Sequence, residues 1–210
     1  AKVSRASAAQ RAGRAGRTRP GRAVRLYTRH DHATRPEFDT PEIQRVDLAE
    51  TLLTLARFEV EALEWFDAPP APALAAAREL LQRLGARDVS SRITELGRRL
   101  VSMPLHPRLA RLVVEAESRG AGDAGCVLAA LLGERDIRER AFEGRKVTPP
   151  TGSSDLLELH SLYQQAERGN FSSDLLRNLG LAAGATSAVK RSAEQLRRLV
   201  RQSGRHSSTS

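Results

Sequence analysis

Aromatic residues, cysteine and long apolar runs are all scarce in this sequence of 210 residues. Phe, Trp and Tyr make up 4 % of the chain and all hydrophobic residues 40 %, so Leu, Ala and Val must build the core, as in packed helices. The single cysteine, Cys126, excludes an internal disulfide and fits a reducing compartment, so we expect a cytoplasmic protein. Its apolar run, 126–132, predicts a buried thiol and is too short to cross a bilayer, so we expect no membrane partner. The first residues contain no apolar segment of the kind found in signal peptides.

Acidic residues are scarce at both ends of the chain. Residues 1–35 contain ten Lys or Arg against one acid, Asp31, for a net charge of +9, and residues 186–210 carry +5. The stretch 36–185 between them therefore carries −5, because the whole chain carries +9. Basic ends favour polyanionic partners such as nucleic acid, whereas the acidic middle argues against a basic surface throughout.

Arginine and glycine alternate in residues 10–17, which read Gln-Arg-Ala-Gly-Arg-Ala-Gly-Arg. Ser7 is placed to cap a helix here, with Gln10 as its capping-box partner. In an α-helix Gln10, Arg14 and Arg17 would lie on one stripe, at i, i+4 and i+7. Two guanidinium groups and one amide on a stripe suit phosphate oxygens. The alternative is a basic helix that faces only solvent.

Two glycines in so short a helix need a physical reason. Gly13 and Gly16 each cost roughly 1 kcal/mol of helix stability relative to alanine. Close approach of a neighbouring backbone or of a ligand is the usual reason for such a cost. Beyond them, Pro20 and Gly21 predict a type II turn, and the alternation in 21–28 predicts an edge strand. The chain offers this strand no partner, and a lone strand is unstable, so we infer that the chain is a fragment.

The remaining sequence is typical of helices separated by short breaks. His30-Asp31-His32 has the spacing of two metal ligands but no third ligand nearby, so we expect no metal site and a solvated loop. Trp65 and Phe66 stand beside a proline turn, and we expect them in the core rather than stacked on bases. Thr94 is predicted to cap the helix that follows it, and His106, between two prolines, is predicted to cap another. We expect a hairpin at 86–93, a loop at 143–154, and helices at about 71–84, 95–102, 108–118, 123–133, 155–168, 173–179 and 185–202, with one more from Asp47. The last helix exposes basic residues that serve either a nucleic-acid backbone or solubility, namely Lys190, Arg191, Arg197, Arg198 and Arg201.

The pattern at 10–17 resembles the sixth conserved motif of superfamily 2 helicases, the DEAH-box branch in particular. Similar phrases follow in the family's order: Pro-Glu-Ile-x-Arg at 41–45, Leu-Gly-Ala-x-Asp at 84–88 and Ile-Thr-x-Leu-Gly at 93–97. Residues 104–111, Pro-Leu-His-Pro-Arg-Leu-Ala-Arg, are similar to the start of the helical ratchet domain of bacterial HrpB-type ATP-dependent RNA helicases. The resemblance covers about residues 4–202.

The resemblance implies a mainly α chain that begins with the end of a RecA-like α/β domain. We expect residues 1–47 to be the remnant of the second RecA-like domain, 48–103 a winged-helix-like domain and 104–202 a helical ratchet, or helicase-associated, domain. Residues 203–210 are polar and are expected to form a disordered tail.

In the family, this motif faces nucleotide held on the other RecA-like domain. Arg14 and Arg17 would then be arginine fingers on the γ-phosphate of ATP, Gln10 would help to place the attacking water, and Arg11 would support them. ATP with Mg²⁺ would be bound mainly by an N-terminal half, the expected partner of this chain, and the nucleic acid is expected to be single-stranded RNA. The sequence has no Gly-x-x-x-x-Gly-Lys-Ser/Thr loop and no Asp-Glu-x-His box, so we expect no ATP hydrolysis by the chain alone.

Two other functions stay open from the sequence. One is a stand-alone module that grips RNA without hydrolysis, which predicts salt-sensitive binding by these residues alone. The other is an interaction protein whose basic ends dock on an acidic partner.

Overall fold

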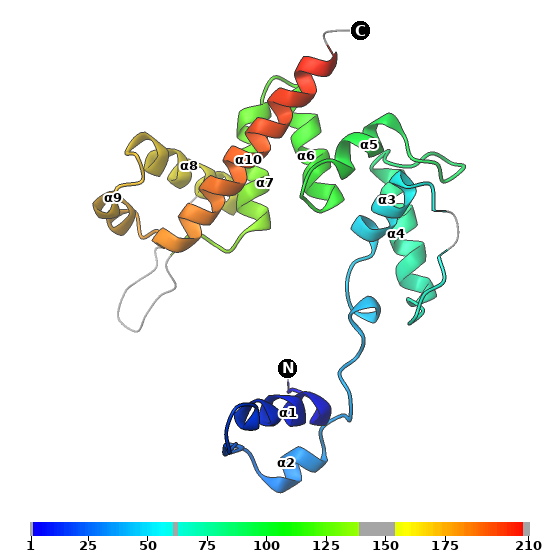
Figure 1. Ribbon diagram of the computed structural model, residues 1–210. Coiled ribbons are helices and arrows are strands. Elements are labelled where there is room, and N and C mark those ends of the chain that lie inside the picture. The colour runs from blue at the N-terminus through cyan, green and yellow to red at the C-terminus, as the bar shows by residue number, and fades with distance from the viewer. Residues whose placement is uncertain (1, 61–62, 139–153, 208–210) are drawn as a thin grey trace. The chain divides into compact units, whose positions relative to one another are not determined.

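The computed structural model describes residues 2–60, 63–138 and 154–207, and within these ranges the chain forms helices and no sheet. Figure 1 shows the helices in chain order, from α1 near the N-terminus to α10 near the C-terminus. Their bounds are α1 Arg5–Ala12, α2 Arg29–Ala33, α3 Ala49–Arg57, α4 Ala71–Arg83, α5 Glu95–Val101, α6 Pro107–Ser118, α7 Gly122–Gly133, α8 Asp155–Arg168, α9 Ser173–Asn178 and α10 Ala183–Ser207, with 3₁₀ turns η1 Gly13–Gly16 and η2 Glu42–Gln44. The expected mainly α class is confirmed.

The chain divides into two compact units. Unit 1 comprises Ala1–Leu48 and Leu63–Leu74, and unit 2 comprises Ala49–Ala62 and Ala75–Ser210. The division into a RecA-like remnant, a winged-helix-like domain and a ratchet domain stays a prediction.

Unit 2 is organised around α7, the most apolar helix. Helices α6, α8 and α10 all pack on α7, which lies beside α10 in Figure 1. Cys126 and Val127 of α7 are buried, as the apolar run 126–132 predicts. The core beyond α7 joins Tyr163 of α8 to Leu181 and Val189, which are all no more than 1 % exposed. Small aliphatic side chains fill this core, in keeping with the low aromatic content.

Several local predictions in unit 2 are confirmed. The Thr94 hydroxyl accepts a hydrogen bond from the Gly97 amide at 2.9 Å and caps α5. The expected hairpin at 86–93 is a minimal one, closed by a single antiparallel bridge between Arg87 and Ile93. His106 is the N-cap of α6, and its ring accepts a hydrogen bond from the backbone amide that follows Pro107.

Other predictions are wrong. Phe66, expected in the core, is fully exposed, while Trp65 is half-buried. Helix α10 continues through Ser207, into the stretch 203–210 that we expected to be a disordered tail.

The expected loop at 143–154 lies outside the described residues except for Ser154. Within the described ranges, each helix is too short or too polar to cross a lipid bilayer.

The expected edge strand at 21–28 does not form. Residues 20–25 have no regular structure, and Val24 and Leu26 are 71 % and 94 % exposed. Alternating side chains make a strand only when a neighbouring strand takes up the backbone hydrogen bonds, and the described part of the chain supplies none. The solvated loop expected around His30-Asp31-His32 is also wrong, because these residues lie in α2, capped by the Thr28 hydroxyl.

Candidate functional site

The first turn of α1 is held by the segment that follows α2. The cap of α1 is Ser4, not Ser7: the Ser4 hydroxyl accepts a hydrogen bond from the Ser7 amide at 3.1 Å. The amide of Ser4 itself donates to the Asp39 carboxylate at 3.2 Å. The next two amides donate to the backbone oxygens of Pro36 and Glu37 at 2.9 and 3.0 Å. The N-terminal amides of α1 therefore find their hydrogen-bond acceptors within unit 1. The C-terminal end of α1 carries the first residues of the motif.

The predicted site residues lie at that other end. Gln10 is in the last turn of α1, and at Gly13 the chain tightens into the 3₁₀ turn η1, which carries Arg14 and has Arg17 as its C-cap. Side chains at i and i+3 of a 3₁₀ turn eclipse each other, so we expect Arg14 and Arg17 to lie near each other. The continuous α-helical stripe that we expected through Gln10 is therefore replaced by a pair of arginines one turn beyond it.

The positive charges of Arg14 and Arg17 are not neutralised by an acidic side chain of the described residues. Both are exposed, as is Gln10. Within the described residues, neither guanidinium group pairs with a carboxylate, whereas Arg35 of the same unit is paired at 2.6 Å. A guanidinium without a partner offers all its donors to a ligand, and a phosphate is the oxyanion that its fork matches best.

The glycines of the motif differ in what surrounds them. A Cβ atom added at Gly13 or Gly16 would meet no atom of the described chain within 4 Å. No neighbour within the chain therefore explains their cost to helix stability. Gly21 is the reverse case: a Cβ there would lie 1.6 Å from the carbonyl oxygen of Ala15. Gly21 does not have the positive φ of a type II turn, so that prediction is wrong, and close backbone approach is what requires glycine.

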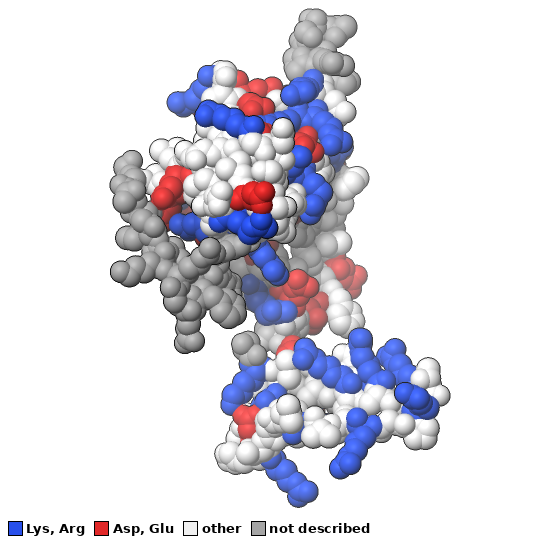
Figure 2. All heavy atoms as spheres, turned by 90° about the vertical axis from the view of Figure 1, so that its left-hand side faces the viewer, with Lys and Arg blue, Asp and Glu red and all other residues white. Residues whose placement is uncertain are grey.

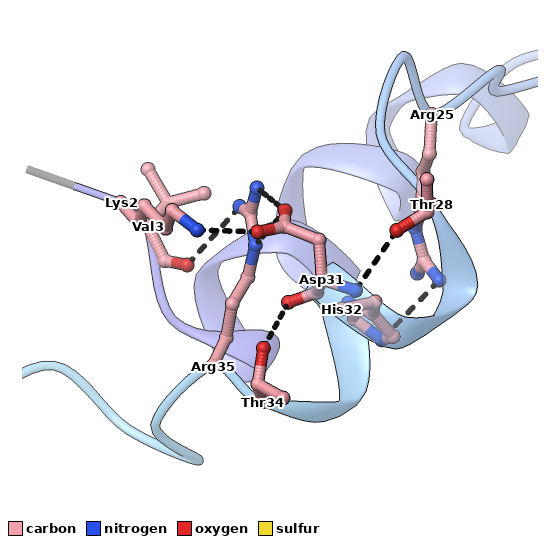
Figure 3. Close-up of polar contacts among 8 residues, drawn as sticks. All are labelled: Lys2, Val3, Arg25, Thr28, Asp31, His32, Thr34 and Arg35. Carbon is pink, nitrogen blue, oxygen red and sulfur yellow. Dashed lines mark hydrogen bonds and ion pairs between the residues drawn. The ribbon is translucent and has the colours of Figure 1, made fainter.

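Asp31 organises the side of unit 1 shown in Figure 3. Its carboxylate accepts hydrogen bonds from Lys2 Nζ at 2.5 Å and from Arg35 Nη2 at 2.6 Å. The Arg35 guanidinium also donates to the Val3 carbonyl at 3.3 Å and lies over the ring of Tyr27, 3.9 Å from its centroid. The hydrogen bonds from Lys2 and Arg35 lower the pKa of Asp31 to about 2. The only acidic residue of 1–35, Asp31, therefore links the N-terminal segment to α2.

The local spacing of His30-Asp31-His32 suggests only a pair of metal ligands and does not indicate this role of Asp31. The signal that indicates its actual role is its isolation, because a single carboxylate among ten basic residues will find a cationic partner. His32 stacks on Tyr27 with 5.9 Å between ring centroids and lies 3.4 Å from Arg25 Nη1. Among the described residues, no group of His, Cys, Asp and Glu is placed to hold a metal ion.

The basic face expected on α10 is smaller than the sequence suggests. Arg197 is an internal link, with its Nε 2.8 Å from Asp123 of α7 and its Nη1 2.9 Å from Glu167 of α8. These carboxylates hold the pKa of Arg197 above its ordinary value, against the effect of burial. Lys190 lies over the ring of Phe171 at 4.8 Å. The densest collection of unpaired arginines in the described residues is therefore in unit 1, whose surface Lys and Arg side chains appear in Figure 2.

The chain is similar to parts of longer RNA helicases. Over 154 residues, 70 % of its length, it is 35 % identical to the ATP-dependent RNA helicase HrpA of Escherichia coli (strain K12), and the match covers 12 % of HrpA. Over 169 residues, 79 % of its length, it is 34 % identical to the "Probable ATP-dependent RNA helicase DHX35" of Pongo abelii and of Homo sapiens. The chain covers 22 % and 23 % of those two proteins. No family model matches the chain.

These relatives support a DEAH-box helicase portion, and the partial coverage fits a C-terminal part of such a protein. The narrower resemblance to HrpB-type helicases stays a prediction.

Proposed function

We propose that this chain is the C-terminal part of an ATP-dependent RNA helicase and that it supplies arginine fingers for ATP hydrolysis. The observation that carries the proposal is the pair of exposed guanidinium groups at the turn η1, Arg14 and Arg17, which have no acidic partner among the described residues. They stand at the end of a Gln-Arg-x-Gly-Arg-x-Gly-Arg sequence in a chain whose relatives are named RNA helicases. The fingers would stabilise charge that develops on the transferred phosphoryl group.

The residues around η1 fit a nucleotide phosphate but do not fit its metal ion. Arg14 and Arg17 are permanent cations with free donors, whereas a magnesium site needs carboxylate oxygens, and no carboxylate of the described chain pairs with either arginine. Mg²⁺ would therefore be held mainly by an N-terminal half, together with most of the ATP. Bound there, ATP supplies the phosphoryl group and Mg²⁺ neutralises the oxygens of its phosphates. Gln10, one turn before the fingers, would help to orient the attacking water.

The other parts of the chain would serve the nucleic acid. Residues 48–103 would form a winged-helix-like domain, and residues 104–202 a helical ratchet domain, which together cap the channel for single-stranded RNA. Contacts would be made mainly to phosphates and would lack sequence preference. We place this activity in the cytoplasm, with the N-terminal half of the helicase as the partner of this chain.

A chimaera tests the fingers directly. This chain would replace the matching region of Escherichia coli HrpA, and RNA-stimulated ATP hydrolysis would be measured at saturating RNA. We expect Arg14→Ala and Arg17→Ala each to lower kcat by about 10³-fold or more, since an arginine finger supplies that factor in related enzymes. The KM for ATP should change little, because a finger acts mainly in the transition state.

The matched control removes an exposed, unpaired arginine from unit 2. Arg168→Ala changes the net charge of the chain by the same amount as either finger variant, and we expect it to retain turnover. A chimaera that hydrolyses ATP equally well with Arg14→Ala and with Arg17→Ala would refute the proposal. If RNA binding by the 210 residues alone persists in that case, the stand-alone RNA-binding module becomes the better interpretation.

A further inference from the structure

The η1 turn has more free arginines beside it than a pair of fingers requires. Arg19 and Arg22 lie in the connection that leaves the turn, and both are exposed. Within the described residues, neither forms an ion pair or a side-chain hydrogen bond. Their presence so close to Arg14 and Arg17 calls for a ligand with more than one phosphate.

Gly21 places these arginines around a single turn. Its α-carbon rests against the backbone of Ala15, because an added Cβ would lie 1.6 Å from the Ala15 oxygen and 2.4 Å from the Ala15 carbonyl carbon. The connection therefore folds back over the middle of η1 and does not lead away from it. Pro20, with its fixed φ, stiffens the same connection. Arg14 and Arg22, although distant along the sequence, stand on either side of one backbone contact.

We infer that Arg14, Arg17, Arg19 and Arg22 form a preformed site for the triphosphate group of a nucleotide. The inference rests on the proposed function for Arg14 and Arg17, and it adds Arg19 and Arg22 as binding residues. Four exposed arginines that flank one backbone contact match a compact polyanion, in which several phosphate charges lie within the reach of one turn. An extended RNA strand would instead be matched by cations laid out along the surface.

The site is a property of this chain, so the chain alone should bind a triphosphate. We would titrate the 210-residue chain with inorganic tripolyphosphate at low salt by calorimetry. The expected result is saturable binding to one site. Gly21→Ala changes no charge but forces the connection away from Ala15, and we expect it to weaken binding at least tenfold. Gly184→Ala in unit 2 is its matched control, because a Cβ at Gly184 also has open space around it, and this variant should bind as the parent does.

A second pair of variants tests the arginines without touching the backbone. Arg19→Ala combined with Arg22→Ala should weaken tripolyphosphate binding at least tenfold, whereas Arg108→Ala combined with Arg168→Ala, the same loss of charge in unit 2, should not. Equal affinities for both double variants, or for both glycine variants, would mean that the chain binds anions diffusely, and the inference would fall. It would also fall if poly(U) RNA depended on Arg19 and Arg22 while tripolyphosphate did not. Either failure is separate from that of the proposed function, which depends on turnover in the chimaera.

Discussion

Replacing Tyr163 by phenylalanine should stabilise unit 2. The Tyr163 side chain is fully buried in the core between α7, α8 and α10. Its ring packs edge-to-face on Phe171, with 5.5 Å between centroids and 60° between planes. Among the described residues its hydroxyl finds no hydrogen-bond partner. Tyr163→Phe keeps the ring and its contact with Phe171 and removes only this hydroxyl.

The magnitude follows from the cost of burying an unpaired polar group. A buried hydroxyl without a partner costs about 1–3 kcal/mol. The free energy of unfolding should rise by that amount, and Tm by about 2–4 °C per kcal/mol in a domain of this size. Tyr163→Ala, in contrast, should lower the free energy of unfolding by about 3–5 kcal/mol, because it leaves a cavity in the core.

The pH dependence of the free energy of unfolding gives a second test of the Tyr163 hydroxyl. Burial raises the pKa of Tyr163 from 10.0 to about 12, and Glu167 adds to the shift. A group whose pKa is raised by folding contributes stability below its unfolded pKa and loses it as the pH rises through the folded pKa. The parent should therefore lose stability between pH 10 and 12 through Tyr163, and the phenylalanine variant should lose less. The advantage of Tyr163→Phe should grow across that range.

Urea unfolding followed by circular dichroism measures the difference. The parent, Tyr163→Phe and Tyr27→Phe would be compared at pH 7, with the m-value as a check that the same surface unfolds. Tyr27 is the only other tyrosine and lies half-buried in unit 1, so its variant controls for the substitution itself. A lower unfolding free energy for Tyr163→Phe would show that the hydroxyl is satisfied in solution and would refute the reasoning.

Three further predictions concern packing and titration. Gly97→Ala should destabilise unit 2 by about 1–3 kcal/mol, because its Cβ would lie 2.1 Å from the oxygen of Ala86, whereas Gly184→Ala, in open space on α10, should stabilise by up to about 1 kcal/mol; urea unfolding compares the two. Acidification from pH 4 to pH 2 should release Lys2 and Arg35 from Asp31, because the pKa of Asp31 is lowered to about 2 and its ion pairs persist only above that range. Two-dimensional NMR signals from unit 1 would follow this release, and Asp31→Asn should show the released state already at pH 7. Cys126 should react with Ellman's reagent at pH 8 only in urea, since burial raises its pKa to about 11; rapid reaction in the folded chain would contradict its burial.

The sequence predicted local structure well wherever a side chain and its nearby backbone decide it. Thr94 caps α5 because its hydroxyl meets an amide only three residues away. Helix α8 spans the expected 155–168, because Leu156, Leu159 and Leu162 recur with helical spacing and pack against one core. Such contacts are local, so periodicity and capping chemistry are enough to identify them.

Predictions failed where a distant partner decides the outcome. Ser7 was expected to cap the first helix, but Ser4 does, where the next two amides donate to the backbone oxygens of Pro36 and Glu37, which no local pattern indicates. The expected core position of Phe66 failed because tertiary contacts, not composition, decide burial. For the candidate site, the motif indicated Arg14 and Arg17, but not the change from α to 3₁₀ geometry at Gly13, which interrupts the stripe that begins at Gln10.

Asp31 is the single carboxylate of residues 1–35, and its partners determine which basic residues of that stretch it neutralises. Asp31 holds Lys2 and Arg35, which leaves the arginines of η1 unpaired. In water two charges about 10 Å apart repel by only about 0.4 kcal/mol, so an exposed cluster costs little while it faces solvent. If a second lobe covers the turn, as the proposed function requires, and the effective dielectric falls from 80 to about 20, an attraction across 4 Å grows from about 1 to about 4 kcal/mol. The same arginines would therefore interact weakly in the open state and strongly in the closed one, which is the behaviour that a finger acting on a closed nucleotide site requires.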